Sequence, residues 1–129
     1  MLELSGIYKL EEGERVIIYN LDSKAILGDK LHRADTFFKR LCGLLPYRSL
    51  PAGEMMLIIP CNSVHTCFMR FPIDVLYLNK EGRIVALYEN VPPWKLLPVK
   101  REACCVLELP AGTIASTAST EGQQLQFSE

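Results

Sequence analysis

The segment 61–75 places polar side chains inside a stretch that otherwise has the composition of a buried strand. A β-strand turns successive side chains to opposite faces. As a strand, it would carry Cys61, Ser63, His65, Cys67 and Met69 on one face and Asn62, Val64, Thr66, Phe68 and Arg70 on the other. Burying polar groups costs free energy unless each group finds a partner. We therefore expect a functional site, if the chain has one, in this segment.

The chain has 129 residues and a formal net charge of −1. This length fits one domain, and we expect a single domain over residues 1–129. A domain of this size buries roughly two thirds of its unfolded surface, which is enough for a hydrophobic core. A net charge near zero gives no electrostatic footprint for nucleic acid or an anionic membrane, so we expect neither as a partner.

The first residues, Met1–Tyr8, lack the basic region and apolar run of a secretory signal peptide. No apolar stretch reaches the roughly 20 residues of a membrane-spanning helix. We therefore expect a cytoplasmic protein. The five cysteines fit this expectation, because their number is odd and Cys104 and Cys105 are adjacent, unlike a secreted disulfide framework. There is no CxxC pair to indicate a zinc ribbon or a thioredoxin-like site, so we expect reduced thiols.

Most of the chain has the pattern of short β-strands separated by proline, glycine and polar turns. We predict strands over 15–19, 25–31, 54–59, 63–71, 73–78, 83–89, 103–109 and 125–127. The strands 73–78 and 83–89 should form a hairpin around the turn at 79–82. This pattern predicts an α+β domain with a mostly antiparallel, curled or barrel-like sheet, one clear helix and a second short helical turn.

The one clear helix follows Asp35 and Thr36, either of which can cap its N-terminus. Its apolar residues at 37, 38, 41, 42 and 45 form one stripe. Lys39 and Arg40 suit its C-terminal end, and Gly43 suits a left-handed stop. The second, short helical turn is expected within 112–119.

Five stretches of the chain are similar to one family of small bacterial and archaeal proteins. The matching stretches are Asp35–Leu44, Val64–Leu78, Asn79–Val85, Glu89–Trp94 and Val106–Gly112. By this resemblance the chain is identified as a member of the family of domain of unknown function 192, with the match running from about Ala34 to Gly122. The resemblance implies a single-domain fold. It implies no activity, because the family is named for lacking one.

Asp74 and Glu108 are lone carboxylates in apolar strands. Desolvation raises a carboxyl pKa, which suits a general acid or base, and paired carboxylates serve in glycoside hydrolysis. The structural alternative is that each accepts hydrogen bonds from backbone N–H groups or pairs with Arg70 or His65. We expect structural roles for both, with a low pKa for Glu108. We also expect His65, Arg70 and Asp74 in one polar cluster, since Pro72 can bend the chain between them.

His65, Cys67 and Met69 form a set of soft ligands at alternate positions, to which Cys61 adds a fourth. Sulfur with imidazole suits copper(I) best and zinc next. The alternative is that Cys67 and Met69 fill the core. The spacing matches no recognised ligand pattern, so we expect no bound metal and no cofactor.

Trp94 follows two prolines, which hold the chain rigid. A rigid, exposed indole makes a good binding anchor, whereas a buried indole would plug one end of a barrel. Both alternatives stay open at this point.

Taken together, the sequence favours a module that binds an unknown small molecule or protein partner. Its candidate binding residues are His65, Met69, Arg70, Asp74, Trp94 and Glu108. The first alternative is a hydrolase that uses Asp74, Glu108 or His65, and the second is a soft-metal protein. Binding is favoured because no motif assembles a nucleophile, a base and oxyanion donors together.

Overall fold

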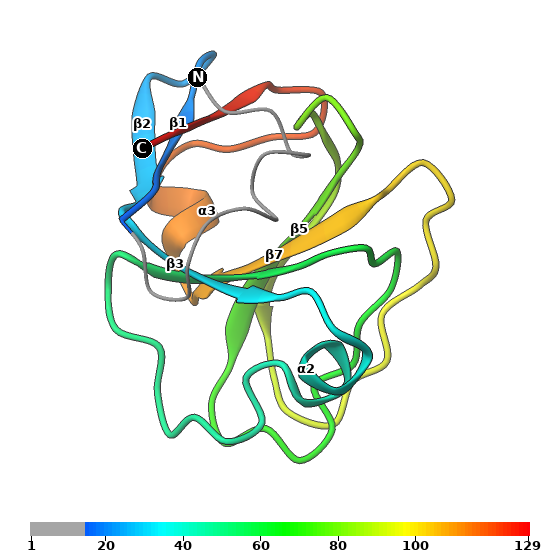
Figure 1. Cartoon of the computed structure of the whole chain (residues 1–129). Helices are drawn as coiled ribbons and strands as arrows, with labels where there is room; N and C mark the ends of the chain where they lie inside the picture. The colour runs from blue at the N-terminus through cyan, green and yellow to red at the C-terminus, as the bar shows by residue number, and fades with distance from the viewer. Residues whose placement is uncertain (1–14) are drawn as a thin grey trace.

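The computed structural model describes residues 15–129, which form two β-sheets and two short helices (Figure 1). The three-stranded sheet has the order β2 (Ala25–Gly28), β1 (Ile17–Asn20) and β8 (Leu125–Ser128). The five-stranded sheet has the order β3 (Lys30–Ala34), β4 (Glu54–Ile58), β7 (Cys105–Pro110), β5 (Ile73–Leu78) and β6 (Ile84–Val91). The helices are α2 (Phe37–Cys42) and α3 (Thr113–Ser116).

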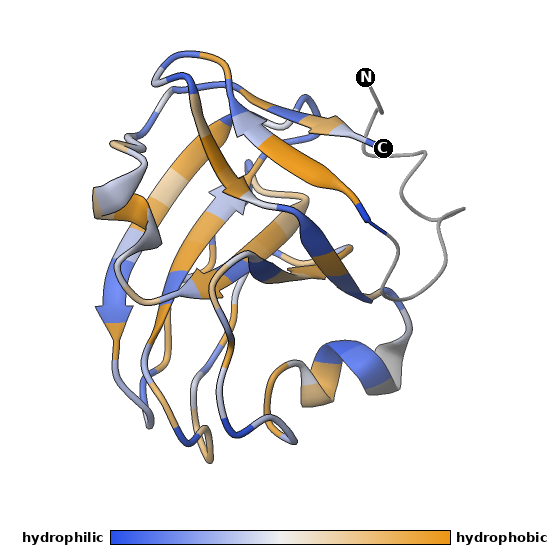
Figure 2. Cartoon of the chain, turned by 90° about the vertical axis from the view of Figure 1, so that its left-hand side faces the viewer, coloured by the Kyte–Doolittle hydropathy of each residue, from blue (hydrophilic) through white to orange (hydrophobic). Residues whose placement is uncertain are grey.

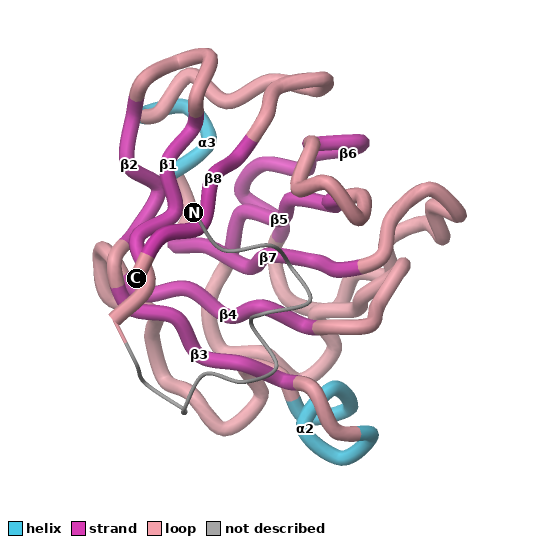
Figure 3. Tube along the Cα trace, turned by 45° about the horizontal axis from the view of Figure 1, so that its top comes forward, coloured by secondary structure: helices cyan, strands magenta, loops and turns pink. Residues whose placement is uncertain are grey.

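The α+β fold with mostly antiparallel strands agrees with the sequence prediction. Within residues 15–129, every strand pair is antiparallel except β3 and β4, which run parallel. The tube in Figure 3 shows the two sheets curling toward each other, and they do not join into a closed barrel. Six of the predicted strands are found within two residues at each end.

The five-stranded sheet is buried on both faces, which is why its central strands β5 and β7 are mostly apolar, with Asp74 and Glu108 as their acidic residues. All six residues of β5 are buried. Leu76 and Leu107 belong to the core shared with the three-stranded sheet and α3. Val75 and Val106 belong to a second core, which the segments after α2 and the loop 61–71 cover. Figure 2 shows hydrophobic residues concentrated on the strands.

The predicted helix is present, with one departure. Thr36 caps it, since its hydroxyl oxygen accepts a hydrogen bond from Lys39 N at 3.1 Å. Gly43 ends it at φ +48°, with its N–H bonded to Lys39 O. The side chains of Phe37 and Phe38 lie outside the described part. The apolar stripe is wrong at Leu41, which is 57% exposed.

The predicted strand 25–31 is two strands in different sheets. The chain leaves the three-stranded sheet at Gly28 and enters the five-stranded sheet at Lys30. The backbone N–H groups of Asp29 and Lys30 both donate to Gly53 O, at 2.9 and 3.0 Å. A Cβ at Gly28 would lie only 2.8 Å from that same oxygen. The break therefore needs a residue without a side chain.

The predicted strand 63–71 is wrong, because this segment is an irregular loop. Its one strand-like contact is a bridge between His65 and Leu96. Thr66 then starts a turn in which its carbonyl oxygen accepts from Met69 N at 3.1 Å. Phe68 has φ +66°, which is incompatible with a strand. The backbone of this loop finds its partners in the loop after β6 rather than in a sheet.

Asp74 is a fully buried structural acceptor on β5, in line with the structural alternative. Its Oδ1 accepts from Asn90 N at 2.8 Å, and its Oδ2 accepts from Gly112 N at 3.1 Å and from Ile114 N at 2.8 Å. These bonds hold the end of β6 and the start of α3 against β5. They also solvate the buried carboxylate in place of water.

We predict that Asp74→Asn lowers the free energy of unfolding by roughly 2–4 kcal/mol, because the amide loses charge-assisted bonds and turns an N–H toward a backbone donor. Urea unfolding at neutral pH measures the loss. Asp22→Asn is the matched control, since Asp22 is exposed and accepts one backbone bond, from Gln124 N. Equal losses in both variants would contradict the role given to Asp74.

Candidate functional site

The two carboxylates that the sequence singled out lie on opposite faces of the five-stranded sheet. In the register of β5 and β7, Asp74 pairs with Leu109, and Val75 pairs with Glu108. Leu109 is in the core shared with the three-stranded sheet, and Val75 is in the core on the α2 side. Asp74 and Glu108 therefore cannot act together as paired catalytic carboxylates.

Glu108 is a buried acid without a compensating partner. It lies between Met56 of β4 and Val75 of β5, both apolar, and is 2% exposed. Within residues 15–129 no group donates a hydrogen bond to its carboxyl. Burial alone raises the pKa of Glu108 to about 8. The expectation of a low pKa and a structural acceptor role is therefore wrong for this residue, and the carboxyl holds its proton at neutral pH.

The carboxyl of Glu108 faces a cavity of about 120 Å³ between the sheet, the end of α2 and the loop 61–71. A Cβ built on Gly43 would stand 3.7 Å from Glu108 Oε1, so the acid reaches the turn that ends α2. The polar and sulfur-bearing side chains that line the cavity are Arg40, Cys42, Cys61, Ser63, His65, Met69 and Glu108. Four of these residues, Cys61, Ser63, His65 and Met69, come from the loop 61–71. The sequence predicts them on one face of a strand, and they line one cavity although the segment is not a strand.

Hydrogen bonds within the loop 61–71 orient the side chains of Cys61 and His65. The Cys61 thiol donates to Ser63 O at 2.9 Å. Burial, more than the nearby Glu108, raises the pKa of Cys61, so the group stays a thiol at neutral pH. His65 Nδ1 accepts from Cys67 N at 3.2 Å, so a neutral ring carries its proton on Nε2. His65 is exposed, which places it at the rim of the cavity.

Arg40 supplies a positive charge to the cavity. Its side chain is half-buried, and its charge lowers the pKa of Cys61 in part, against the effect of burial. No ion pair joins it to an acidic residue within the described range. From the sequence, Arg40 is predicted only to stabilise the C-terminal end of the helix. The spacing between Arg40 and Gly43 is the sequence signal for this position. A helix that ends at Gly43 places Arg40 in its last turn, on the sheet face that carries Glu108.

Of the other candidates, only Met69 belongs to this cavity. Met69 lines it, whereas Asp74 is bound by backbone amides on the far face of the sheet. Arg70 is exposed and is not among the hydrogen-bond partners of Asp74. The predicted polar cluster of His65, Arg70 and Asp74 is therefore wrong. Trp94 is 62% exposed, so it does not plug the fold.

The soft-metal set is not assembled as the strand pattern suggested. Cys61, His65 and Met69 line the cavity, but Cys67 is not among its lining residues. Among the residues that the structure describes, no three His, Cys, Asp or Glu side chains are grouped to hold a metal ion. All five cysteines are free.

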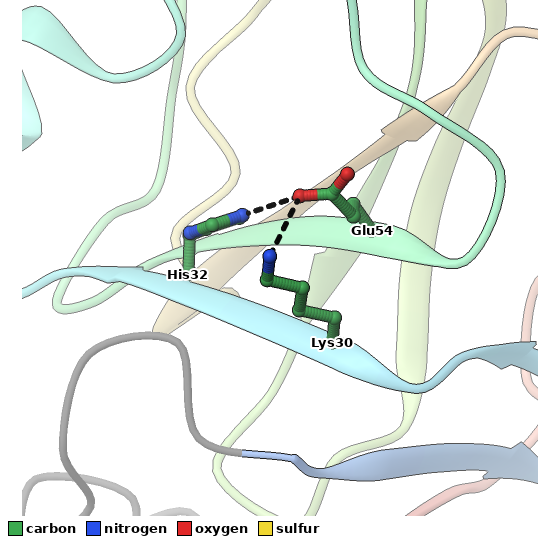
Figure 4. A network of polar contacts seen from close by, with 3 residues as sticks. All are labelled: Lys30, His32 and Glu54. Carbon is green, nitrogen blue, oxygen red and sulfur yellow. Dashed lines mark hydrogen bonds and ion pairs between the residues drawn. The ribbon is translucent and has the colours of Figure 1, made fainter.

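A second polar network lies on the parallel pair β3 and β4 (Figure 4). His32 Nε2 donates to Glu54 Oε1 at 2.9 Å, and Lys30 Nζ is 3.6 Å from the same oxygen. The hydrogen bond from His32 lowers the pKa of Glu54, with burial opposing it and Lys30 reinforcing it. The sequence did not indicate this network, because parallel pairing of two separated strands leaves no local pattern. Glu54 thus pairs with both His32 and Lys30, and we assign this network a structural role.

The comparisons with known proteins agree with the resemblance noted in the sequence. A family model described as "Uncharacterized ACR" and named domain of unknown function 192 matches residues 19–127. The chain belongs to this family. A UPF0127 protein of Pyrococcus furiosus is 34% identical over 99 residues, covering 73% of this chain and 83% of the relative. A UPF0127 protein of Thermococcus kodakarensis is 30% identical over 117 residues, covering 87% of this chain and 73% of the relative.

Two solved structures share the fold of this family member. A protein of unknown function from Novosphingobium aromaticivorans has a TM-score of 0.75 and 19% identity, covering 87% of this chain and 83% of the other. A protein of Sinorhizobium meliloti proposed to regulate transcription has a TM-score of 0.76 and 23% identity, covering 92% and 97%. At these identities the likeness concerns the fold alone. No helix within residues 15–129 is long and apolar enough to span a membrane.

The raised pKa of Glu108 predicts a specific pH dependence of stability. Between the ordinary pKa near 4.5 and the folded value of about 8, the folded protein keeps a proton that the unfolded chain releases. Stability therefore falls as pH rises through this window. Glu108→Gln should not show this fall. The free energy of unfolding of the variant minus that of the native protein should therefore rise by roughly 2–4 kcal/mol between pH 4.5 and pH 8.

Denaturant unfolding across this pH range measures the effect. The buried amide of Gln has its own effect on stability, which does not depend on pH. The test is therefore how the difference in free energy of unfolding between variant and native protein changes with pH. Glu102→Gln serves as the control, because Glu102 is exposed and should change the pH profile little. A difference that stays constant with pH would show that Glu108 ionises normally.

Proposed function

We propose that this protein binds a small carboxylate in the Glu108 cavity. The observation that carries the proposal is the buried, unpartnered carboxyl of Glu108 at the base of a cavity lined by Arg40. An ordinary core would satisfy such a group or replace it with an apolar residue. A ligand that accepts a hydrogen bond from the protonated Glu108 carboxyl supplies the partner that this carboxyl lacks.

The protonation of Glu108 supports an acceptor as its partner. Because burial raises the pKa of this carboxyl to about 8, it is a hydrogen-bond donor at neutral pH. Arg40 brings a positive charge and several N–H donors to the same cavity. A ligand with a carboxylate toward Arg40 and a second oxygen toward Glu108 satisfies both groups.

The size of the cavity limits the ligand. A protein cavity of about 150 Å³ accommodates benzene, so a cavity of about 120 Å³ suits a ligand of about five or six non-hydrogen atoms. Acids of two or three carbons with a 2-hydroxy or 2-oxo group have this size. Their second oxygen supplies the acceptor for Glu108.

Binding is favoured over hydrolysis by the chemistry of the lining. Asp74 lies across the sheet, so Glu108 has no carboxylate partner in the cavity. Cys61 is held as a thiol, and only the thiolate is an effective nucleophile. The sulfur and imidazole groups then act as lining and rim rather than as reacting groups.

We predict that millimolar glycolate, glyoxylate, lactate or pyruvate raises the melting temperature at pH 6.5 and has no effect at pH 9.5. The reason is that Glu108 loses its proton above a pKa of about 8 and then repels the ligand's acceptor oxygen. Thermal melts with titration calorimetry measure this. Acetamide and methylammonium are ligand controls that lack the carboxylate.

Variants separate the two recognition groups. Arg40→Gln should weaken binding at least about tenfold through loss of a charge-assisted bond, whereas Lys39→Gln, whose side chain lines a different cavity, should not. Glu108→Gln retains an N–H donor and should bind with no dependence on pH between 6.5 and 9.5. Stabilisation by methylammonium, or none by any acid, would refute the proposal.

A further inference from the structure

Four large apolar side chains project from two loops at one end of the molecule. Phe68 is 70% exposed, Trp94 62%, Leu96 80% and Val99 63%. The loops are 61–71, before β5, and 92–101, between β6 and β7. In Figure 1 the loop 61–71 lies at the lower end near α2, where the loop 92–101 begins before it rises along the right-hand side to β7. Single exposed apolar residues are ordinary, but Phe68 and Trp94 come from different loops and their rings are in contact.

Thr66 fixes the two loops to each other. Its hydroxyl donates to Pro92 O at 2.6 Å and accepts from Lys95 N at 2.9 Å. Its backbone N–H donates to Lys95 O, and its carbonyl oxygen accepts from Trp94 N at 3.0 Å. Thr66 is fully buried, so these bonds are shielded from water.

The fixed loops hold two aromatic rings outward in a strained conformation. Phe68 has φ +66° and Trp94 has φ +70°, which bulky residues rarely adopt. Their ring centroids are 4.5 Å apart. A relaxed backbone would turn these rings elsewhere, so the loop pair presents them together as a rigid apolar ridge.

The charge on these loops is opposite to that of the whole chain. Residues 61–71 and 92–101 contain no aspartate or glutamate, and they contain Arg70, Lys95, Lys100 and Arg101. The whole chain carries a net charge of −1. The expectation of no membrane contact rested on that overall value, which averages out a local excess of four positive charges. A partner that fits the ridge therefore combines negative charge with an apolar interior.

The shape of the surface favours a lipid bilayer over a peptide or a folded protein. Phe68, Trp94 and Leu96 are each more than 60% exposed, so the ridge projects from the surface. Binding of an extended peptide or helix requires a groove. Aromatic rings with adjacent basic residues are the combination found at membrane interfaces.

We propose that the loops 61–71 and 92–101 dock this protein onto an anionic lipid surface. Phe68, Trp94 and Leu96 insert among the headgroups, and Arg70 and Lys95 pair with lipid phosphates. The docked orientation places the loop 61–71, which also lines the Glu108 cavity, at the membrane. This inference is independent of the ligand proposed for that cavity.

Trp94 is the single tryptophan of the chain and reports on docking directly. Vesicles of equal parts phosphatidylglycerol and phosphatidylcholine should co-sediment the protein and shift Trp94 emission to shorter wavelength. Lipids with brominated chains should quench this emission. Pure phosphatidylcholine vesicles should bind far less, and raising the salt from 0.1 to about 0.5 M should reduce binding to the anionic vesicles.

Variants test the two contributions separately. Phe68→Asn with Leu96→Ser should weaken binding at least about tenfold, and asparagine tolerates the positive φ at position 68. Arg70→Gln with Lys95→Gln should weaken binding to anionic vesicles about 30-fold. Ile26→Ser is the matched control, because Ile26 is 59% exposed on β2 in the three-stranded sheet and should leave binding unchanged.

Three results would overturn the proposal. The first is no binding of the native protein to anionic vesicles at low salt. The second is an equal loss of binding in Ile26→Ser and in the Phe68→Asn, Leu96→Ser variant, which would indicate non-specific adsorption. The third is self-association in analytical ultracentrifugation that Phe68→Asn abolishes, without vesicle binding, which would assign the ridge to contact with a second copy of the chain.

Discussion

The five-stranded sheet is buried on both faces, and this constraint determines where each polar group of the molecule lies. A side chain on β5 or β7 must enter one of two cores, and alternation decides which. Asp74 enters one core and Glu108 the other. The oxygens of Asp74 accept hydrogen bonds from three backbone amides, whereas Glu108 is a neutral acid without a partner. This difference is the reason why we assign a structural role to Asp74 and propose a ligand-binding role for Glu108.

The loop 61–71 connects the two surfaces to which we assign function. Its inner side supplies Cys61, His65 and Met69 to the Glu108 cavity, and its tip presents Phe68 beside Trp94. The bonds of Thr66 to the loop 92–101 make the segment rigid although it has no regular secondary structure. A rigid loop beside a cavity positions binding residues without the flexibility that would cost ordering entropy.

Much of this fold could be predicted from the sequence, because its strands are short, apolar and separated by turns. The cap at Thr36, the stop at Gly43 and the hairpin around 79–82 follow from local chemistry. The sequence predicts a strand over most of the loop 61–71, because alternation alone does not reveal which backbone partners a segment finds. Glu108 was located, but the absence of a donor near it is a tertiary fact. Arg40 and the pairing of His32 with Glu54 likewise depend on contacts between distant segments.

The central claim is that Glu108 is a buried, protonated and unpartnered acid at neutral pH. The most direct test is a titration of its side-chain carboxyl carbon by NMR in protein labelled with ¹³C at glutamate, with Glu108→Gln used to assign the resonance. The account predicts a single transition with a pKa of about 8, far from the ordinary value near 4.5. A transition near 4.5 would show that the carboxyl is solvated or paired in solution, and would contradict the account.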